Sequence, residues 1–288
     1  MKKTLFICAQ HLLPQHLLSR LVGKIASCTN PWVKNTFIKH FAKRYQIDMS
    51  IAAEPDLTAY KSFNDFFTRA LRDGVRPIDG DSNSIVSPAD GAVSQLGKIE
   101  HGRVIQAKGR SYSLTTLLGG DFDASKPFIN GQFATIYLSP KDYHRVHMPV
   151  AGTLTRSVYI PGDLYSVNGT TAENVENLFA RNERLVAFFD TEFGPMAVVL
   201  VGAMIVAGIE TVWSGQVAPY QHKPIVTDHS NQPREPITLE KGEEMGRFKL
   251  GSTAIVLFGE DVMHWQESLG PESPVTLGEA IGFRNTDA

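Results

Sequence analysis

Acidic, basic and nucleophilic side chains gather in three short clusters of the sequence, each close to an apolar run. One cluster holds Asp90 in an Asp-Gly pair, one holds His144 and His147, and one holds the Gly-Ser pair formed by Gly251 and Ser252. Each has an ordinary structural interpretation on its own, because Asp-Gly and Gly-Ser pairs are common in turns and many histidines are structural. The clusters are residues 87–91 (SPADG), 143–149 (YHRVHMP) and 248–253 (FKLGST).

The Gly-Ser pair has a second, chemical interpretation. A serine that follows glycine can attack the carbonyl carbon of its own upstream peptide, because glycine has no Cβ and permits the close approach. The resulting ester can eliminate to dehydroalanine, which hydrolyses to a pyruvoyl group at the new N-terminus. The serine hydroxyl then needs a histidine as base and a carboxylate to orient that histidine, as in serine hydrolases.

Helices are expected to precede the three clusters. Leu13, Leu17, Leu21 and Ile25 recur every fourth residue, which predicts a short amphipathic helix that opens at Pro14. Further helices are predicted from an Asn30 cap with Pro31 at the first helical position, and over residues 63–71 after a Ser62 cap.

From about residue 85 the sequence changes to short apolar runs separated by Gly, Pro, Asn and Asp, which predicts a mainly antiparallel β domain. The expected class is therefore α+β, with a helical, basic segment over residues 1–75 and a β-rich catalytic domain over residues 76–288. The runs lie at residues 85–86, 92–93, 133–138, 154–160, 185–189, 197–201 and 254–258.

Positive charge is concentrated at the N-terminal end. Residues 1–47 hold eight Lys or Arg and no Asp or Glu, although the whole chain has a net charge of -2. Basic amphipathic helices with an aromatic residue such as Trp32 can lie in an anionic membrane surface. The same helices could simply pack on the body with a basic face in solvent. Nucleic acid is disfavoured, because no recognised binding motif accompanies the charge.

An export signal and a membrane span are both disfavoured. The apolar run over residues 5–9 is interrupted by Gln10 and His11, and the longest run, residues 196–209, is short of the roughly 18 to 20 residues that cross a bilayer. The two cysteines, Cys8 and Cys28, leave the rest of the chain without a disulfide, which favours a reducing compartment. A soluble or peripheral protein is expected.

Taken together, the motifs resemble those of the bacterial and mitochondrial phosphatidylserine decarboxylases. SPADG, YHRVHMP and FKLGST occur in the family's order, with FNDFFTR upstream and VGAMIVAGIETV between them. The resemblance runs from about Phe63 to Phe258, and the LGST form of the cleavage motif is intact at its four positions.

The resemblance implies a proenzyme that cleaves itself between Gly251 and Ser252 into a β chain (1–251) and an α chain (252–288). Asp90, His147 and Ser252 match the family's self-processing triad as orienting acid, base and nucleophile, and His144 matches the histidine proposed to handle protons in decarboxylation. Ser252 would become a covalently bound pyruvoyl group that forms a Schiff base with the substrate, with no metal expected.

The resemblance also implies partners and a location. The substrate would be phosphatidylserine in the bilayer and the product phosphatidylethanolamine, so the enzyme would dock peripherally on the cytoplasmic side of the cell membrane. Docking on an anionic membrane surface would give the basic N-terminal helices a purpose. The α and β chains would form a heterodimer, and a dimer of heterodimers is compatible with this.

Two other interpretations of the residues stay open. Asp90, His144 and His147 could be ligands of a metal hydrolase, although two histidines three apart on one strand point to opposite faces, and Gly251 and Ser252 are then unexplained. The chain could also be an inactive β module that binds lipid headgroups and never cleaves.

Overall fold

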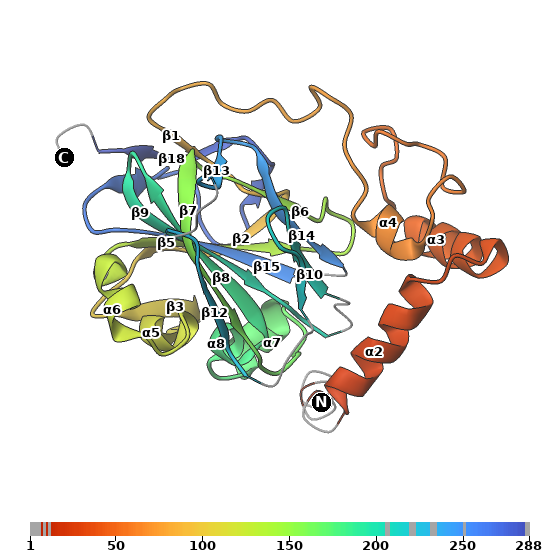
Figure 1. Cartoon of the computed structure of the whole chain (residues 1–288), viewed down its shortest axis with the longest axis horizontal. Coiled ribbons are helices and arrows are strands. Elements are labelled where there is room, and N and C mark those ends of the chain that lie inside the picture. Colours follow the sequence, from red (N-terminus) through yellow and green to blue (C-terminus); the bar gives the residue numbers. More distant parts are fainter. Residues whose placement is uncertain are drawn as a thin grey trace.

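The computed structural model describes residues 7, 10, 13–204, 208–218, 223–230, 235–249 and 252–285, with Ser252 described by its backbone. Helices from the N-terminal part of the chain lie to one side of a body made of antiparallel sheets (Figure 1). This arrangement is the α+β organisation expected from the sequence.

Three helices make up the described N-terminal segment, and their starts follow the predicted capping signals. The Asn30 side chain accepts hydrogen bonds from the backbone N–H groups of Trp32 and Val33, which satisfies two donors that a helix leaves free at its start. Ser62 caps the third helix by accepting from the Asp65 N–H. The helices are α2 (Gln15–Ala26), α3 (Pro31–Tyr45) and α4 (Phe63–Phe67).

The predicted end of the third helix, at residue 71, is wrong. α4 ends at Phe67, where Thr68 turns its hydroxyl back to the carbonyl of Asn64 at 2.9 Å. Leu71 instead forms an isolated antiparallel bridge with Ala52. Pairing with a distant residue therefore overrides the helical pattern of the local sequence.

The first helix shows its apolar side to solvent. Leu13, Leu17, Leu21 and Ile25 are between 43% and 56% exposed, and we call these four residues the apolar stripe. The buried residues of α2 lie on the opposite side and are Gln15, Ser19 and Ala26. Among the described residues, no helix combines the length and hydropathy that crossing a membrane would require.

One large antiparallel sheet forms the centre of the body, and it contains every long strand that the sequence predicts. β15 lies in its middle, paired with β9 on one side and β5 on the other. In spatial order the strands are β12 (Ile225–Asp228), β7 (Gly152–Ile160), β8 (Arg184–Thr191), β9 (Gly194–Val201), β15 (Ser252–Phe258), β5 (Gln132–Leu138), β2 (Gly91–Lys98) and β17 (Pro274–Val275), with β13 (Thr238–Leu239) also paired to β7.

Smaller sheets cover or extend this central sheet. A four-stranded sheet carries one of the two predicted histidines, and a three-stranded sheet joins an early strand to the C-terminal part of the chain. The four strands are β11 (Gly215–Ala218), β10 (Gly208–Thr211), β14 (Glu244–Lys249) and β6 (Arg145–His147); the three are β1 (Ser84–Val86), β18 (Ala280–Arg284) and β16 (Met263–Trp265); a hairpin is made by β3 (Arg103–Ala107) and β4 (Arg110–Ser113).

Side chains alternate along β15 and feed two separate cores. Ala254, Val256 and Phe258 belong to the core shared with the smaller sheets, whereas Ile255 and Leu257 belong to the core on the other face. Short helices close that second core: α5 (Leu114–Leu117), α6 (Phe122–Ser125), the 3-10 turn η1 (Lys126–Phe128), α7 (Gly169–Asn174) and α8 (Leu178–Arg181).

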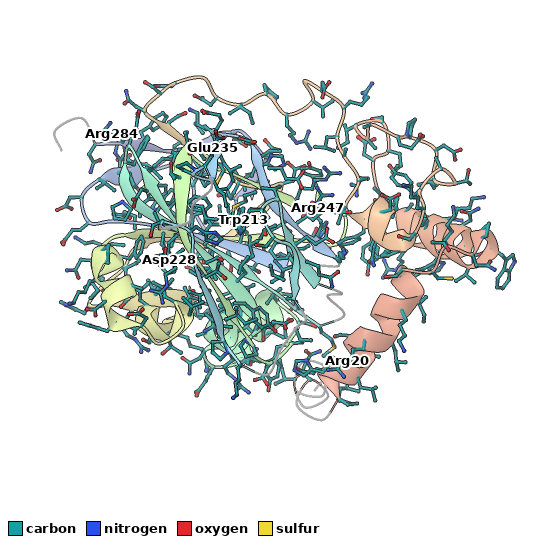
Figure 2. The ribbon with its side chains drawn as sticks, in the orientation of Figure 1. Arg20, Trp213, Asp228, Glu235, Arg247 and Arg284 are labelled. Atoms are coloured by element: carbon teal, nitrogen blue, oxygen red, sulfur yellow. The ribbon has the colours of Figure 1, made fainter. Side chains whose placement is uncertain are left out.

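The N-terminal helices have a third core of their own and meet the sheets through polar contacts. Arg145 of β6 donates to the carbonyl of Thr68 at the end of α4, and its guanidinium also pairs with Glu244. Glu244 pairs in turn with Arg247, which lies on the side of the sheets nearest α4 (Figure 2). The end of α4 is thereby fixed against the strand that carries the histidine cluster.

Candidate active site

The Gly-Ser pair lies where the chain passes from one sheet to another. β14 ends at Lys249 in the four-stranded sheet, and β15 begins at Ser252 in the nine-stranded sheet. The backbone of Ser252 pairs with Leu138 of β5, whereas Gly251 and the Ser252 side chain lie outside the described residues. The predicted cleavage position therefore lies between two strands that belong to different sheets.

His147 is held as a neutral base. Its Nδ1 lies 2.8 Å from the carbonyl oxygen of Gly242, and because a carbonyl can only accept, Nδ1 carries the hydrogen. Nε2 therefore keeps its lone pair, and it lies 3.2 Å from the Tyr143 hydroxyl, which can donate to it. Burial lowers the pKa of His147 below its usual value, so the imidazole is neutral.

Asp90 is bound by a different partner from the predicted one. Its two carboxylate oxygens accept from the Arg76 guanidinium at 2.8 and 2.7 Å, and one of them also accepts from the backbone N–H of Leu277. The acceptor that orients the His147 ring is the Gly242 carbonyl. Asp90 reaches His147 through the chain instead, because Pro88, two residues earlier, accepts the backbone N–H of His147 at 2.8 Å.

His144 lies outside the strand, in the turn before β6, and is fully buried. Its Nδ1 lies 2.8 Å from the Asp142 carbonyl oxygen, so this nitrogen carries the hydrogen. Its Nε2 is buried without a hydrogen-bond partner among the described residues, and its ring packs 4.0 Å from that of Phe67. Burial lowers the pKa of His144 to about 3, so Nε2 is an unprotonated acceptor.

The position of His144 connects it to the Gly-Ser junction. Its carbonyl accepts the backbone N–H of Phe248 at 3.0 Å, and Phe248 precedes Ser252 by four residues. A buried polar atom without a partner is costly, so the free Nε2 of His144 is the kind of group that a reaction site retains.

Asp90, His144 and His147 each bond to a different group of the protein. Each imidazole directs Nδ1 to a backbone carbonyl, and the Asp90 carboxylate is taken by Arg76. In the part of the chain that the structure describes, no group of three or more His, Cys, Asp or Glu is placed to hold a metal ion. The geometry gives the metal-hydrolase interpretation no support.

A cavity of about 470 Å³ opens beside the start of β15. Thr253, the residue after Ser252, lines it, and the Thr253 hydroxyl is buried without a hydrogen-bond partner among the described residues. Tyr137, which pairs with Thr253 across the sheet, lines the same wall. The opposite wall comes from Asn168 and the helix α7.

Several residues of this site are missing from the sequence-based prediction. Tyr143 lies within the YHRVHMP cluster and its hydroxyl could have been considered, because it is four residues from His147. Gly242 and Arg76 carry no such signal. Gly242 is 95 residues from its partner His147 and Arg76 is 14 residues from its partner Asp90, so only the fold brings each pair together.

Comparison with known proteins gives matches over nearly the whole chain. A family model described as phosphatidylserine decarboxylase matches residues 63–283, and a second, described as PSD, matches residues 5–46.

Curated relatives with the name phosphatidylserine decarboxylase proenzyme are similar over the same length. The protein of Pseudomonas fluorescens strain Pf-5 is 64% identical over 283 residues, which is 98% of each chain. The protein of Stutzerimonas stutzeri strain A1501 is 60% identical over 282 residues, covering 98% of this chain and 95% of the relative. The protein of Pseudomonas aeruginosa strain LESB58 is 61% identical over 282 residues, covering 98% of each.

Proposed function

The chain belongs to the phosphatidylserine decarboxylase family, and from this premise we propose that it matures by cutting itself between Gly251 and Ser252. As a member of the family it is a carboxy-lyase that acts on phosphatidylserine. The observation that carries the proposal is the position of the LGST motif, between strands of two different sheets and shortly after Phe248, whose backbone N–H bonds to the carbonyl of the buried His144.

Self-cleavage needs no reagent besides water. The Ser252 hydroxyl attacks the Gly251 carbonyl carbon, the peptide C–N bond breaks, and the nitrogen of residue 252 takes a proton. The new ester then loses Gly251 as a carboxylate by elimination, which leaves dehydroalanine at residue 252. Water replaces the nitrogen as ammonia and leaves a ketone. We assign the base of the first step to His147, whose neutral Nε2 carries the lone pair that the Tyr143 hydroxyl faces in the uncleaved chain.

The surroundings of residue 252 fit a pyruvoyl group. Such a group supplies a ketone that condenses with the amine of serine and accepts the electrons released with carbon dioxide. The Nε2 of His144 and the Thr253 hydroxyl are both buried and unpartnered among the described residues, so they can bond to polar atoms brought by the reaction. His144 would deliver a proton to the α carbon of the substrate after carbon dioxide has left.

The cavity beside Thr253 is the place for the substrate headgroup. It touches the residue after Ser252, and its wall combines the apolar surfaces of Ala92, Ala107 and Phe179 with polar groups. A mixed lining of this kind suits a polar headgroup that continues into apolar acyl chains.

Purified protein offers a direct test. Intact-mass measurement is expected to find two polypeptides, residues 1–251 and 252–288, without added protease. Borohydride added with substrate is expected to trap an adduct on the shorter polypeptide, as condensation with an amine requires. A fully active preparation made only of the full-length chain would contradict the proposal.

We also propose that the chain binds peripherally to the cytoplasmic side of the cell membrane, and the N-terminal segment supports the membrane contact. The apolar stripe is exposed to solvent, and Arg20 lies on α2, the helix that carries most of this stripe (Figure 2). Trp32, at the start of α3, is 79% exposed. Apolar and aromatic residues with basic neighbours are suited to a membrane surface with anionic lipid. Lys2, Lys3 and Cys8 lie outside the described residues.

Replacing two residues of the apolar stripe should weaken membrane binding. The double variant Leu17→Ser, Leu21→Ser is expected to bind vesicles of mixed phosphatidylserine and phosphatidylcholine roughly tenfold to a hundredfold less tightly, because two half-exposed leucines no longer enter the lipid. Sedimentation with vesicles measures this change. The fold should be unaffected, since both side chains already face solvent.

The matched control is Phe122→Ser on α6, which removes an apolar side chain that is 58% exposed and lies on the far side of the sheets from α2 (Figure 1). It should bind vesicles as the wild type does. Equal binding by the double variant and the wild type would exclude the stripe as the docking surface. Charge reversal should be restricted to Lys39 and Lys43, because Lys34 is buried and donates to the Thr58 carbonyl.

Asp90 is proposed to support His147 from a distance. Arg76→Ala is expected to slow self-cleavage as much as Asp90→Ala does, on the order of tenfold. Either change removes the two-bond ion pair between these largely buried side chains and loosens residues 87–91, whose Pro88 carbonyl holds His147. We also expect either change to lower the free energy of unfolding by about 1–3 kcal/mol. Gel analysis of cleavage over time and denaturant unfolding measure the two effects.

Arg110→Ala is the control, because its ion pair with Glu176 is exposed and contributes little. A chain with Asp90→Ala that stays intact, beside one with Arg76→Ala that matures at the wild-type rate, would instead place the carboxylate directly on His147.

A further inference from the structure

We propose that Gln15 and Gln10 are positioning residues that connect the membrane-docking helix to the wall of the substrate cavity. The inference rests on the proposed function, because it takes the cavity beside Thr253 as the place of the headgroup. Gln15 lies on the side of α2 opposite the apolar stripe and is buried against the body. A buried, hydrogen-bonded glutamine at a helix position that faces the body is there to hold a specific partner.

That partner is the extended segment after β7. The Oε1 atom of Gln15 accepts the backbone N–H of Leu164 at 2.7 Å, and the Oε1 atom of Gln10 accepts that of Ser166 at 3.0 Å. The Gln15 side chain also donates to the Gln10 carbonyl at 2.7 Å, which ties the two glutamines together. One short stretch of the N-terminal segment thus holds every second backbone N–H of residues 164–166. Leu164 is 149 residues from Gln15 in sequence, and Ser166 is 156 residues from Gln10.

The same segment is held from its other side by the body. Asn182 accepts the backbone N–H of Tyr165 at 3.1 Å and donates to the Tyr165 carbonyl at 2.8 Å. Residues 164–166 therefore lie between Asn182 and the two glutamines, with each backbone N–H bonded to a side chain. Loss of the glutamines frees one side while Asn182 still anchors the other.

The segment leads directly into the cavity wall. Two residues after Ser166, Asn168 caps α7 through reciprocal hydrogen bonds with Thr171. Asn168, Gly169 and Ala172 line the same cavity as Thr253. A shift of residues 164–166 is therefore expected to move a wall of the proposed headgroup cavity, and misplacement by about 1 Å can cost a large factor in rate.

One helix would serve both membrane docking and the shape of the cavity. α2 carries the apolar stripe on one side and the glutamine contacts on the other, so the surface that meets the membrane and the surface that shapes the cavity belong to one rigid helix. The enzyme would then have a formed cavity only when α2 is docked on the body, in the orientation that also presents the stripe to lipid.

Gln15→Met tests the role of Gln15, because methionine keeps the volume and removes both hydrogen bonds. Self-cleavage and vesicle sedimentation are expected to equal those of the wild type. Hydrogen exchange at the amides of Leu164 and Ser166 is expected to speed up roughly tenfold. The kcat/KM for a short-chain phosphatidylserine dispersed as monomers is expected to fall on the order of tenfold.

Gln15→Glu keeps the acceptor oxygen and is expected to recover most of the slow exchange and of the activity, and Gln10→Met should act in the same direction as Gln15→Met. His40→Ala, at an exposed position on α3, is the control that should change neither. Unchanged exchange at Leu164 would overturn the contact. Faster exchange with unchanged kcat/KM would overturn the positioning role. Hydrogen exchange and kcat/KM are both measured independently of borohydride trapping in the wild type, which tests the proposed pyruvoyl chemistry itself.

Discussion

Ser252→Ala is expected to yield an intact 288-residue chain with no decarboxylase activity, because alanine has no hydroxyl to attack the Gly251 carbonyl. The loss should be complete in both respects, since the same residue would be the nucleophile of maturation and the source of the reactive ketone. Denaturing gel electrophoresis and release of labelled carbon dioxide from phosphatidylserine measure the two losses.

Ser268→Ala, at an exposed position downstream in the same strand-rich region, is the matched control and should mature normally. Ser252→Cys and Ser252→Thr keep a nucleophilic atom and are expected to cleave more slowly than the wild type. A Ser252→Ala protein that still appears as two polypeptides would show that another residue is the nucleophile.

His147→Ala should block maturation, whereas His144→Ala should mature and then decarboxylate slowly. Removing a general base costs roughly a hundredfold to ten-thousandfold in rate. The Nδ1 of His147 is held by a backbone carbonyl and its Nε2 faces the Tyr143 hydroxyl, so the ring of the proposed base is fixed in one orientation. His144 is fully buried and neutral, and suits a proton transfer sheltered from water.

Time courses of cleavage, followed by activity measurements on matured protein, separate the two roles. His144→Ala protein that stays uncleaved, together with His147→Ala protein that matures normally, would reverse the assignment. Tyr143→Phe is a useful further variant, because it removes the hydroxyl on Nε2 of His147 and keeps the ring.

Local sequence signals predicted most of the fold. Capping residues such as Asn30 and Ser62 mark helix starts because their side chains bond to neighbouring N–H groups, which is a purely local interaction. The apolar runs of the central sheet were equally visible. The end of α4 was not, because it depends on the bridge between Leu71 and Ala52, two residues that only the tertiary fold brings together.

The candidate site divides in the same way. The clusters that contain Asp90, His144, His147 and Ser252 were found from their residue types, and their joint meaning came from the order of the motifs, which resembles that of the family. How they are connected could not be read from the sequence. The carbonyl of Gly242 is a backbone atom that any residue could offer, and Arg76 lies in the long connection that arches over the sheets before β1 (Figure 1).

The leucine pattern of α2 also did not predict which side of the helix packs on the body. A stripe of leucines every fourth residue usually faces a core, yet here it faces solvent, and the buried residues of α2 include the polar Gln15 and Ser19. The sequence allowed both packing on the body and binding to a membrane. The buried Gln15 and the exposed Leu17 show that the helix packs on the body through the side opposite the stripe, which leaves the stripe available for the membrane binding proposed above.

The central place of β15 has a consequence for the life of the mature protein. Its hydrogen bonds to β9 and β5 would keep residues 252–288 in place after the peptide bond is cut, although no covalent link remained. Once the two polypeptides came apart, however, refolding would be a second-order encounter between a large chain that lacks its middle strand and a short peptide with an exposed apolar strand prone to aggregate. Unfolding would be reversible before cleavage and irreversible after it. The working lifetime of the mature enzyme would then depend on how slowly it unfolds.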